Sequence, residues 1–378
     1  MIKTDFDLAI IGGGLAGLST AIQMNKLGYE VILFEKETFP FHKVCGEYIA
    51  MESWDFLQGL GVPLENMQLP KITRLHISDC RGKLLAHKLN PGGFGISRYS
   101  LDNELHQLAK QSGVVVYDNT KVLAIDFYQG KSVIKTNSAT FNAKVACGSW
   151  GKRANIDIKL RREFIHQPPK KNQHFIAVKY HVKTDFPDDL IELHNFENGY
   201  CGISTVENNM QCLCYLTTAY NLQQCNNDIK KLEKTYLAKN PHLNQYFQFS
   251  KFIFNEPLVI SQISFASKEA INDHIFMVGD AAGMIAPLCG NGMSMALHGS
   301  KLVVPILDNL LKGNLNRLDA ERQYASIWKA QFNSRLRTGR WFQQLFGRPL
   351  VTNTALRALN SFPSLTSSLI GLTHGKPF

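Results

Sequence analysis

The 378-residue sequence lacks several features that would place it in other classes of protein. It has no uniformly apolar run of about 20 residues, the length that a membrane-spanning helix needs, and no internal repeat or low-complexity segment. Its eight cysteines show no paired C-x-x-C spacing, which argues against a zinc site. The sequence also holds no H-E-x-x-H motif and no Ser/His/Asp arrangement. What remains is an ordinary globular composition, long enough for two domains.

Secretion, disulfides and metal binding are not expected either. The first residues, MIKTDFDLAI, lack a charged segment followed by a long apolar run, so the sequence predicts no signal peptide. We expect a cytoplasmic protein without a transmembrane segment, and peripheral contact with a membrane is an alternative. Its cysteines are expected to be free thiols, and no metal is predicted.

Positive charge is in excess and partly concentrated. The formal net charge is +10, and basic residues gather within 152–171 and 335–348. A solvated surface accounts for such runs, whereas attraction to an anionic cofactor, substrate or membrane face is the alternative. No recognised nucleic-acid-binding module accompanies the charge, so nucleic acid is not an expected partner.

Glycine is abundant close to the start of the chain. Five glycines lie within Leu8–Lys36, although each one weakens the interior of a helix or strand. The apolar pattern around them predicts a strand at 7–11, a helix at 15–27 and a second strand at 30–34. Gly28 stands where a helix C-terminus favours glycine.

The turn between the first strand and the helix carries Gly12-x-Gly14-x-x-Gly17. Gly12 permits the tight turn, Gly14 lets a pyrophosphate approach the backbone, and Gly17 lets the helix pack on the strand. Glu35, at the end of the second strand, is suited to accept hydrogen bonds from ribose hydroxyls. This context predicts a dinucleotide site, and both NAD and FAD fit these residues.

Further along the chain the patterns change. A helix is expected near residues 100–112 with Ser100 or Asp102 as its cap, and a hairpin around 122–134. Between 174 and 220 four segments alternate with period two, which predicts an antiparallel sheet with a turn at 207–209. The last fifty residues are expected to be helical, with interruptions at 347–349 and at Pro363.

A second glycine-containing passage lies at 275–307. A buried strand at 275–278 is expected to end at Gly279-Asp280, and a loop with Pro287, Gly290 and Gly292 precedes an apolar helix. A helix that begins at glycines presents backbone N–H groups without side-chain partners. Such a helix N-terminus stabilises negative charge on a bound group.

Together these passages resemble the flavoprotein monooxygenase and geranylgeranyl reductase group, which includes p-hydroxybenzoate hydroxylase-like proteins. Residues 279–292 match its G-D-A-A-x-x-x-x-P-x-x-G-x-G string, and 40–47 match the P-x-x-K-x-C-G-E loop of the reductase branch. Arg98 opens an R-x-x-x-D-x-x-L segment. The resemblance implies that Asp280 contacts the ribityl chain of FAD and that the helix after Gly292 points toward the flavin C2 carbonyl.

The resemblance implies an α/β fold, with a Rossmann-like GR2-type FAD-binding domain, an antiparallel substrate domain and a helical C-terminal region. The expected boundaries are 1–70, 98–165 and 266–325 for the FAD domain, 71–97 and 166–265 for the substrate domain, and 326–378 for the helical region. The expected FAD contacts are Gly12, Gly14, Leu15, Ala16, Gly17, Glu35, Lys36, Lys43, Cys45, Gly46, Arg98, Val122, Gly279, Asp280, Pro287, Gly290, Asn291, Gly292 and Met293.

Departures from the hydroxylases favour the reductase branch. Many hydroxylases of the group carry Asp-Gly after the middle strand, where this sequence has Cys147-Gly148, so direct use of a nicotinamide is in question. Gly283 stands where hydroxylases often have His. The W-x-W-x-I-P motif of flavin-dependent halogenases is absent.

Cys45 and Glu47 are the catalytic candidates. A thiol beside the flavin is able to give a proton to a carbon that receives hydride, and a buried small hydrophobe is the alternative role for Cys45. Glu47 is an acid/base or an anchor of its loop, and Lys43 holds phosphate or pairs with Glu47. Cys289 lines the cavity or packs, and His298 is not expected to be catalytic. Met284, Met293 and Met295 belong to the core or to a substrate wall.

The sequence therefore predicts an FAD-dependent oxidoreductase that acts on a hydrophobic isoprenoid, lipid or polyketide-derived molecule, with double-bond reduction first. An NAD(P)H- and O2-dependent monooxygenase is the alternative, and a flavin-binding protein without turnover is a second one. The electron donor, with NAD(P)H among the candidates, is not identified. The C-terminal segment packs on the FAD domain, covers the active site or lies on a membrane.

Overall fold

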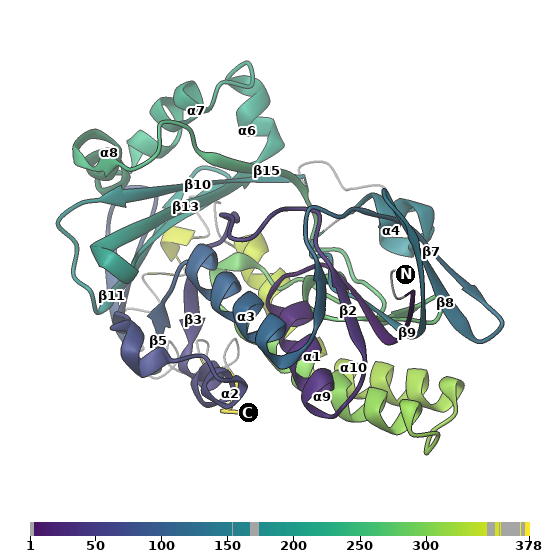
Figure 1. Cartoon of the computed structure of the whole chain (residues 1–378). Coiled ribbons are helices and arrows are strands. Elements are labelled where there is room, and N and C mark those ends of the chain that lie inside the picture. Colours follow the sequence, from purple (N-terminus) through teal and green to yellow (C-terminus); the bar gives the residue numbers. More distant parts are fainter. Residues whose placement is uncertain are drawn as a thin grey trace.

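The computed structural model describes residues 4–152, 154–166, 174–345, 352–354, 356, 371 and 375–378. These residues form two β-sheets with helices around them (Figure 1). The interruptions expected at 347–349 and Pro363 lie outside this set. No helix in the described part of the chain is long and apolar enough to cross a membrane.

The first sheet is built around five parallel strands in the order β17-β9-β1-β2-β6, with β16 and the hairpin β7–β8 attached in antiparallel pairings. The strands are β1 (Asp5–Ile11), β2 (Val31–Phe34), β6 (Val115–Tyr117), β7 (Val122–Tyr128), β8 (Lys131–Thr136), β9 (Thr140–Gly148), β16 (Ile271–Asn272) and β17 (Ile275–Met277). Leu8 and Ile10 of the inner strand β1 are fully buried, which explains its continuous apolar run. The predicted strand–helix–strand unit is confirmed.

The second sheet follows the order β14-β10-β13-β12-β11-β4-β5-β3, with β15 also paired to β10. Its strands are β3 (Tyr48–Ala50), β4 (Lys71–Ser78), β5 (Leu84–Gly95), β10 (Phe175–Lys183), β11 (Leu190–Phe196), β12 (Gly199–Val206), β13 (Met210–Thr218), β14 (Lys251–Phe252) and β15 (Leu258–Ile263). The α/β fold class is confirmed. The sheet is antiparallel except where β11 runs parallel to β4, which departs from the fully antiparallel sheet that was expected.

Helices surround both sheets. They are α1 (Leu15–Lys26), α2 (Trp54–Leu60), α3 (Arg98–Ser112), α4 (Asn155–Lys159), α5 (Glu163–His166), α6 (Ala219–Gln224), α7 (Ile229–Thr235), α8 (Pro241–Phe249), α9 (Gly292–Leu311) and α10 (Arg317–Leu345). The predicted cap of α3 at Ser100 or Asp102 is wrong. The helix begins earlier, at Arg98, so Ser97 is the residue whose side chain accepts the Ser100 N–H, at 3.0 Å.

The two faces of the second sheet have different neighbours. Helices α6, α7 and α8 cover the outer face, above β10 and β13 in Figure 1. On β11, Glu192 and His194 are buried on this side, whereas Ile191 and Leu193 point the other way and keep partial exposure. The inner face is therefore the one that lines an open space.

A polar cluster joins α8 to the outer face. The Glu192 carboxylate contacts His76 at 3.0 Å and His194 at 2.8 Å, and it accepts a hydrogen bond from the Tyr246 hydroxyl at 2.6 Å. Although burial opposes ionisation, hydrogen bonds from His194 and Tyr246 lower the pKa of Glu192 to about 2. Burial lowers the pKa of His194, against the effect of Glu192.

We predict that acid weakens this cluster. Because the pKa of His194 is lower in the folded than in the unfolded protein, the unfolded chain takes up the proton first as pH falls below about 6.5, and stability is lost. Between pH 8 and pH 5.5, the free energy of unfolding in urea should fall less for His194→Gln than for wild type. His174→Gln, at an exposed position, is the control. An equal pH dependence in wild type and His194→Gln would contradict the account.

Candidate active site

A cavity of about 330 Å³ lies between the first sheet and the inner face of the second. Its walls come from the β1–α1 turn, the loop at 44–48, the loop at 278–293 and strands β4, β10, β11, β12 and β13. Segments that are far apart in the sequence therefore meet around one space. Most of the side chains that the second sheet contributes are apolar.

Two helix N-termini face this cavity. Helix α1 begins after Gly14 and helix α9 begins at Gly292, and neither has a side-chain hydrogen bond at its cap. By contrast, α3, α6, α7 and α8 each begin with a side chain that accepts a backbone N–H. Gly14, Leu15, Gly292 and Met293 line the cavity. Both ends therefore offer N–H groups and positive dipole charge to a bound group.

The glycines of the first turn differ in how much space a side chain would have. A Cβ on Gly12 would lie 2.5 Å from the Ser149 carbonyl oxygen, and one on Gly17 would lie 2.1 Å from the Gly12 oxygen. These two glycines are required by packing. At Gly14 the nearest atom to such a Cβ is Arg98 Nη2, at 3.6 Å, so space remains beside the backbone. The cradle fits the pyrophosphate of a dinucleotide.

Glu35 secures the same turn. Its carboxylate accepts the Gly13 N–H at 2.9 Å and the Glu37 N–H at 3.1 Å. These bonds explain how the end of β2 fixes the glycine turn. The contact of Glu35 with a ribose stays a prediction.

Positive charge adjoins the N-terminus of α1. The buried Asp102 carboxylate accepts hydrogen bonds from Arg98, at 2.7 and 2.8 Å, and from Lys43, at 2.8 Å. Burial opposes its ionisation, but the charges of Arg98 and Lys43 lower the pKa of Asp102. Two cations share one carboxylate, which leaves an excess positive charge near Gly14. The alternative that Lys43 pairs with Glu47 is wrong, because the Lys43 ammonium reaches Asp102 instead.

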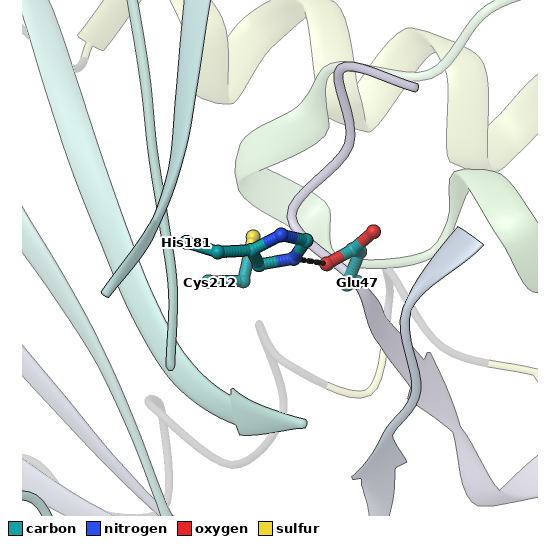
Figure 2. Close-up of side chains that lie close together, drawn as sticks. All are labelled: Glu47, His181 and Cys212. Atoms are coloured by element: carbon teal, nitrogen blue, oxygen red, sulfur yellow. Dashed lines mark hydrogen bonds and ion pairs between the residues drawn. The ribbon is translucent and has the colours of Figure 1, made fainter. Parts of the chain in front are cut away.

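Glu47 is the buried anchor of the loop at 43–47. Its backbone is in the left-handed region, with φ 56°, and its side chain is fully buried. The carboxylate contacts His181 Nε2 at 2.7 Å (Figure 2). It also pairs with the Lys179 ammonium and accepts the Arg98 backbone N–H at 2.8 Å. Burial opposes ionisation, yet the bond with His181 and the charge of Lys179 lower the pKa of Glu47.

The carbonyls of this loop are held as well. Each of the five carbonyl oxygens from 43 to 47 lies within hydrogen-bond distance of a donor from another segment. In chain order the donors are Lys179, Lys152, Cys212, Ser204 and the backbone N–H of Ile96, at 3.1, 3.4, 3.2, 3.5 and 3.1 Å. The inner face of the second sheet thus fixes the position of Cys45, which stands half-buried at the cavity wall.

Glu47, His181 and Cys212 bring three metal-binding atoms within 4.8 Å of one another (Figure 2). The Lys179 ammonium already compensates the carboxylate charge. Burial raises the pKa of Cys212 well above its usual value, so the sulfur keeps its proton, whereas a metal binds the thiolate. The chemistry of these donors suits a salt bridge better than a cation.

Two cations fix the segment after β17. The partly buried Lys268 donates to the backbone oxygens of Asp280, at 2.7 Å, and Lys152, at 2.6 Å, and burial lowers its pKa to about 8. Arg162, which is fully buried, donates to the Ala281 oxygen at 2.9 Å and pairs with Asp157 and Glu269. The sequence showed a basic run at 152–171, which includes Arg162. It did not indicate that Arg162 and Lys268 reach the segment after β17.

Most of the expected FAD contacts gather at the cavity, and the rest lie around it. The residues that line it are Gly14, Leu15, Ala16, Cys45, Gly46, Arg98, Gly279, Asp280, Pro287, Gly290, Gly292 and Met293. Those that do not are Gly12, Gly17, Glu35, Lys36, Lys43, Val122 and Asn291. Lys36 is exposed and pairs with Glu37, and Val122 begins β7. Contact of any of these residues with the cofactor remains a prediction.

The remaining candidates also have definite places. Cys289 and Met284 line the cavity, whereas Met295 is buried in the core. His298 stacks on Phe378 with ring centroids 4.2 Å apart, away from the cavity-lining residues. Sequence reasoning missed Lys179 and His181, because alternation along β10 does not reveal what its inner side chains contact.

The fold and the glycine sites define a dinucleotide-binding protein, and a comparison with protein families identifies the dinucleotide. Residues 5–323 match the FAD binding domain family, so the chain belongs to that family. FAD is accordingly its cofactor, and the protein is an FAD-dependent enzyme of the oxidoreductase and monooxygenase type. The two uncapped helix ends and the cradle at Gly14 fit this cofactor.

Curated relatives are distant and have different functions. The chain is 25% identical to conditioned medium factor receptor 1 of Dictyostelium discoideum, over 86% of this chain and 68% of that protein. It is 21% identical to the menaquinone reductase of Mycobacterium tuberculosis, over 80% and 76% of the two chains. A pyrrole-2-carbonyl carrier-protein chlorinase of Pseudomonas fluorescens is 22% identical, over 83% and 78%.

Solved structures share the fold. A flavoprotein/dehydrogenase from Cytophaga hutchinsonii superposes with a TM-score of 0.79 at 18% identity, over 97% of this chain and 92% of that one. A geranylgeranyl bacteriochlorophyll reductase-like protein from Thermoplasma acidophilum gives 0.78 at 16% identity, over 98% and 100%. The flavin-dependent brominase Bmp2 gives 0.79 at 17% identity, over 98% and 93%.

We predict that Lys179→Met lowers the free energy of unfolding by about 3–5 kcal/mol, because the buried Glu47 carboxylate loses its compensating charge. The double variant Glu47→Gln/Lys179→Met should recover much of this loss. Denaturant unfolding of the single and double variants measures both values.

The control is Lys135→Met, which breaks an exposed pair with Asp126 and should cost at most about 1 kcal/mol. If Lys179→Met were no more harmful than this control, Glu47 would not depend on Lys179.

Proposed function

We propose that this protein uses FAD to reduce a carbon–carbon double bond in a hydrophobic isoprenoid, lipid or polyketide-derived molecule. The observation that carries the proposal is the position of Cys45. Its half-buried thiol stands at the wall of the cavity that is shared by two uncapped helix N-termini and the apolar inner face of the second sheet. The C-G-E loop and Gly283, both typical of the reductase branch, support the same reaction.

We infer the position of FAD from where positive charge lies around the cavity. The pyrophosphate lies at the N-terminus of α1 beside Arg98 and Lys43, where positive charge is in excess. The flavin end lies toward the N-terminus of α9, beside Asp280. When bound, FAD supplies the hydride and accepts electrons, and the protein provides binding, orientation and protons.

The substrate is proposed to lie on the inner face of the second sheet. Ile77, Ile191 and Leu193 are partly exposed there and line the cavity. An apolar wall binds hydrocarbon and excludes water from the reacting carbon. No described acidic side chain on β4, β11 or β12 lines the cavity, so these strands offer no charged partner to a cationic substrate.

Cys45 is the proposed proton donor to the substrate carbon. The bond from Cys212 to its carbonyl and the neighbouring bonds to the loop hold its backbone in place. Glu47, fully buried and paired with Lys179, is suited to anchor the loop rather than to exchange protons. The electron donor that reduces FAD is not specified by these residues.

The test is a single turnover without oxygen. Holoenzyme reduced by dithionite is mixed with menaquinone-4 or geranylgeranyl diphosphate in detergent, and FAD absorbance and product mass are followed. Because reduced FAD or residual dithionite also converts a quinone to its quinol, the extracted product is first exposed to air, which restores the quinone ring. The proposal predicts that FAD is reoxidised without O2 and that the air-exposed product is still two hydrogen atoms heavier than the substrate. Reoxidation that needs O2, with a product that gains an oxygen atom, would instead identify a monooxygenase and overturn the proposal.

For Cys45→Ala we predict that the same turnover slows about 10²-fold, the size expected for loss of a proton donor. The rate of FAD reduction by dithionite and the FAD content should not change. Cys80→Ala is the control, since Cys80 is half-buried outside the cavity. An unchanged turnover rate in Cys45→Ala would exclude the thiol as the donor.

A further inference from the structure

One glycine in the second sheet is not explained by the protein itself. Gly202 lies in the middle of β12, between Leu193 of β11 and Cys214 of β13. Its φ is outside the left-handed region, and the atom nearest to an added Cβ is Leu193 Cδ2, at 3.3 Å. Glycine inside a strand weakens it. A Cβ at this position would require only a small shift of the flexible Leu193 side chain, so neither backbone geometry nor a fixed backbone contact requires glycine here.

The other strand glycines of this sheet behave differently. A Cβ on Gly93 or Gly199 would lie 2.3 or 2.5 Å from a backbone oxygen of a paired strand, and one on Gly95 would lie 1.9 Å from the Thr205 backbone oxygen of β12. Packing therefore requires glycine at those three positions. At Gly202 the side without a Cβ belongs to the cavity wall, and the residue keeps partial exposure.

Small residues surround Gly202 on the inner face. Ser204 on β12 and Cys214, opposite Gly202 on β13, line the cavity with it, and the larger Leu193 stands opposite on β11. Beyond Cys214 the next residue in register is Lys179 of β10, so the shallow hollow is confined to β12 and β13. A flat group fits such a hollow better than a bulky branched one, because it contacts the backbone of both strands at once.

A hydroxyl whose hydrogen has no acceptor adjoins the hollow. Tyr200, two residues before Gly202 on the same face, is 5% exposed and lines the cavity. The Leu288 backbone lies close to its oxygen, but no acceptor for the hydroxyl hydrogen exists among the described residues. Burial raises the pKa of Tyr200 well above its usual value, so the hydroxyl keeps its proton. A buried donor without an acceptor is costly unless a ligand supplies one.

We propose that Gly202 and Tyr200 form a substrate seat for a flat apolar group that carries a carbonyl oxygen. The flat group lies on the hollow at Gly202, and the carbonyl accepts a hydrogen bond from Tyr200. Tyr200 packs with Met284 and Leu288, from the segment that precedes Gly290, so the carbonyl lies toward the proposed flavin end of the cavity. This inference rests on the proposed function and narrows its substrate class to conjugated carbonyl compounds such as quinones and enones.

The test compares two probes of the same ring size on the oxidised holoenzyme. Menadione is a flat naphthoquinone with carbonyl oxygens, and 2-methylnaphthalene is its hydrocarbon counterpart. Binding of each probe is followed by the change in FAD absorbance. Wild type should bind menadione about tenfold more tightly, the effect of one hydrogen bond to a buried donor.

Variants separate the two parts of the seat. Tyr200→Phe should abolish the preference for menadione and leave the affinity for the hydrocarbon unchanged. Gly202→Val should lower the affinity for both probes about tenfold or more, because its side chain fills the hollow. Gly202→Ala should lower both affinities by less. Tyr180→Phe, which removes a buried hydroxyl from the outer face of the same sheet, should leave both affinities unchanged. FAD content and thermal midpoint confirm that each variant is folded.

Three results would overturn the proposal. The first is a preference for menadione that persists in Tyr200→Phe. The second is that Gly202→Val binds both probes as tightly as wild type does, and the third is that wild type binds neither probe. Different results would refute the proposed reaction and the proposed substrate seat. If the binding pattern holds but reduced holoenzyme reduces no double bond, the proposed function is wrong and the seat stands.

Discussion

Two helix N-termini that face one cavity are the constraint on which the rest of this structure depends. Helices α1 and α9 begin at glycines without side-chain caps, whereas α3, α6, α7 and α8 each begin with a side chain that accepts a backbone N–H. N–H groups arranged in this way are stabilised by a bound anion or carbonyl. The excess positive charge of Arg98 and Lys43 reinforces one end. The family assignment to FAD binding explains why both ends are kept open.

The second sheet supports the loop at 43–47 and also forms the apolar wall of the cavity. Its inner side chains Lys179 and His181 reach Glu47 and hold the loop that carries Cys45. The rest of that face is apolar and lines the cavity. The outer face is covered by α6, α7 and α8, which protect the sheet from water. One sheet thereby places a hydrophobic surface and a thiol in fixed relation to the cofactor site.

Local features of the fold could be predicted from the sequence because periodicity and glycine spacing are local signals. The strand–helix–strand unit, the hairpin of β7 and β8, and the helix after Gly292 are examples. Long-range contacts could not be predicted in this way. Glu47 and Lys179 are 132 positions apart, and their pairing depends on how the second sheet packs against the loop. The parallel pairing of β4 with β11 depends on tertiary structure as well. The cap at Ser97 is by contrast a local contact with the N–H of Ser100, and the sequence prediction placed it too late in the chain.

The most direct test of the account is the reduction potential of bound FAD when charge is added at the start of α9. A side chain at Gly292 has room, since the nearest atom to its Cβ would be Ile285 Cγ2, at 3.8 Å. If this helix end stabilises negative charge on reduced FAD, Gly292→Asp should have a lower midpoint potential than the neutral, equally sized Gly292→Asn. Equal potentials in the two variants would show that the flavin does not lie at the N-terminus of α9, and would contradict the account.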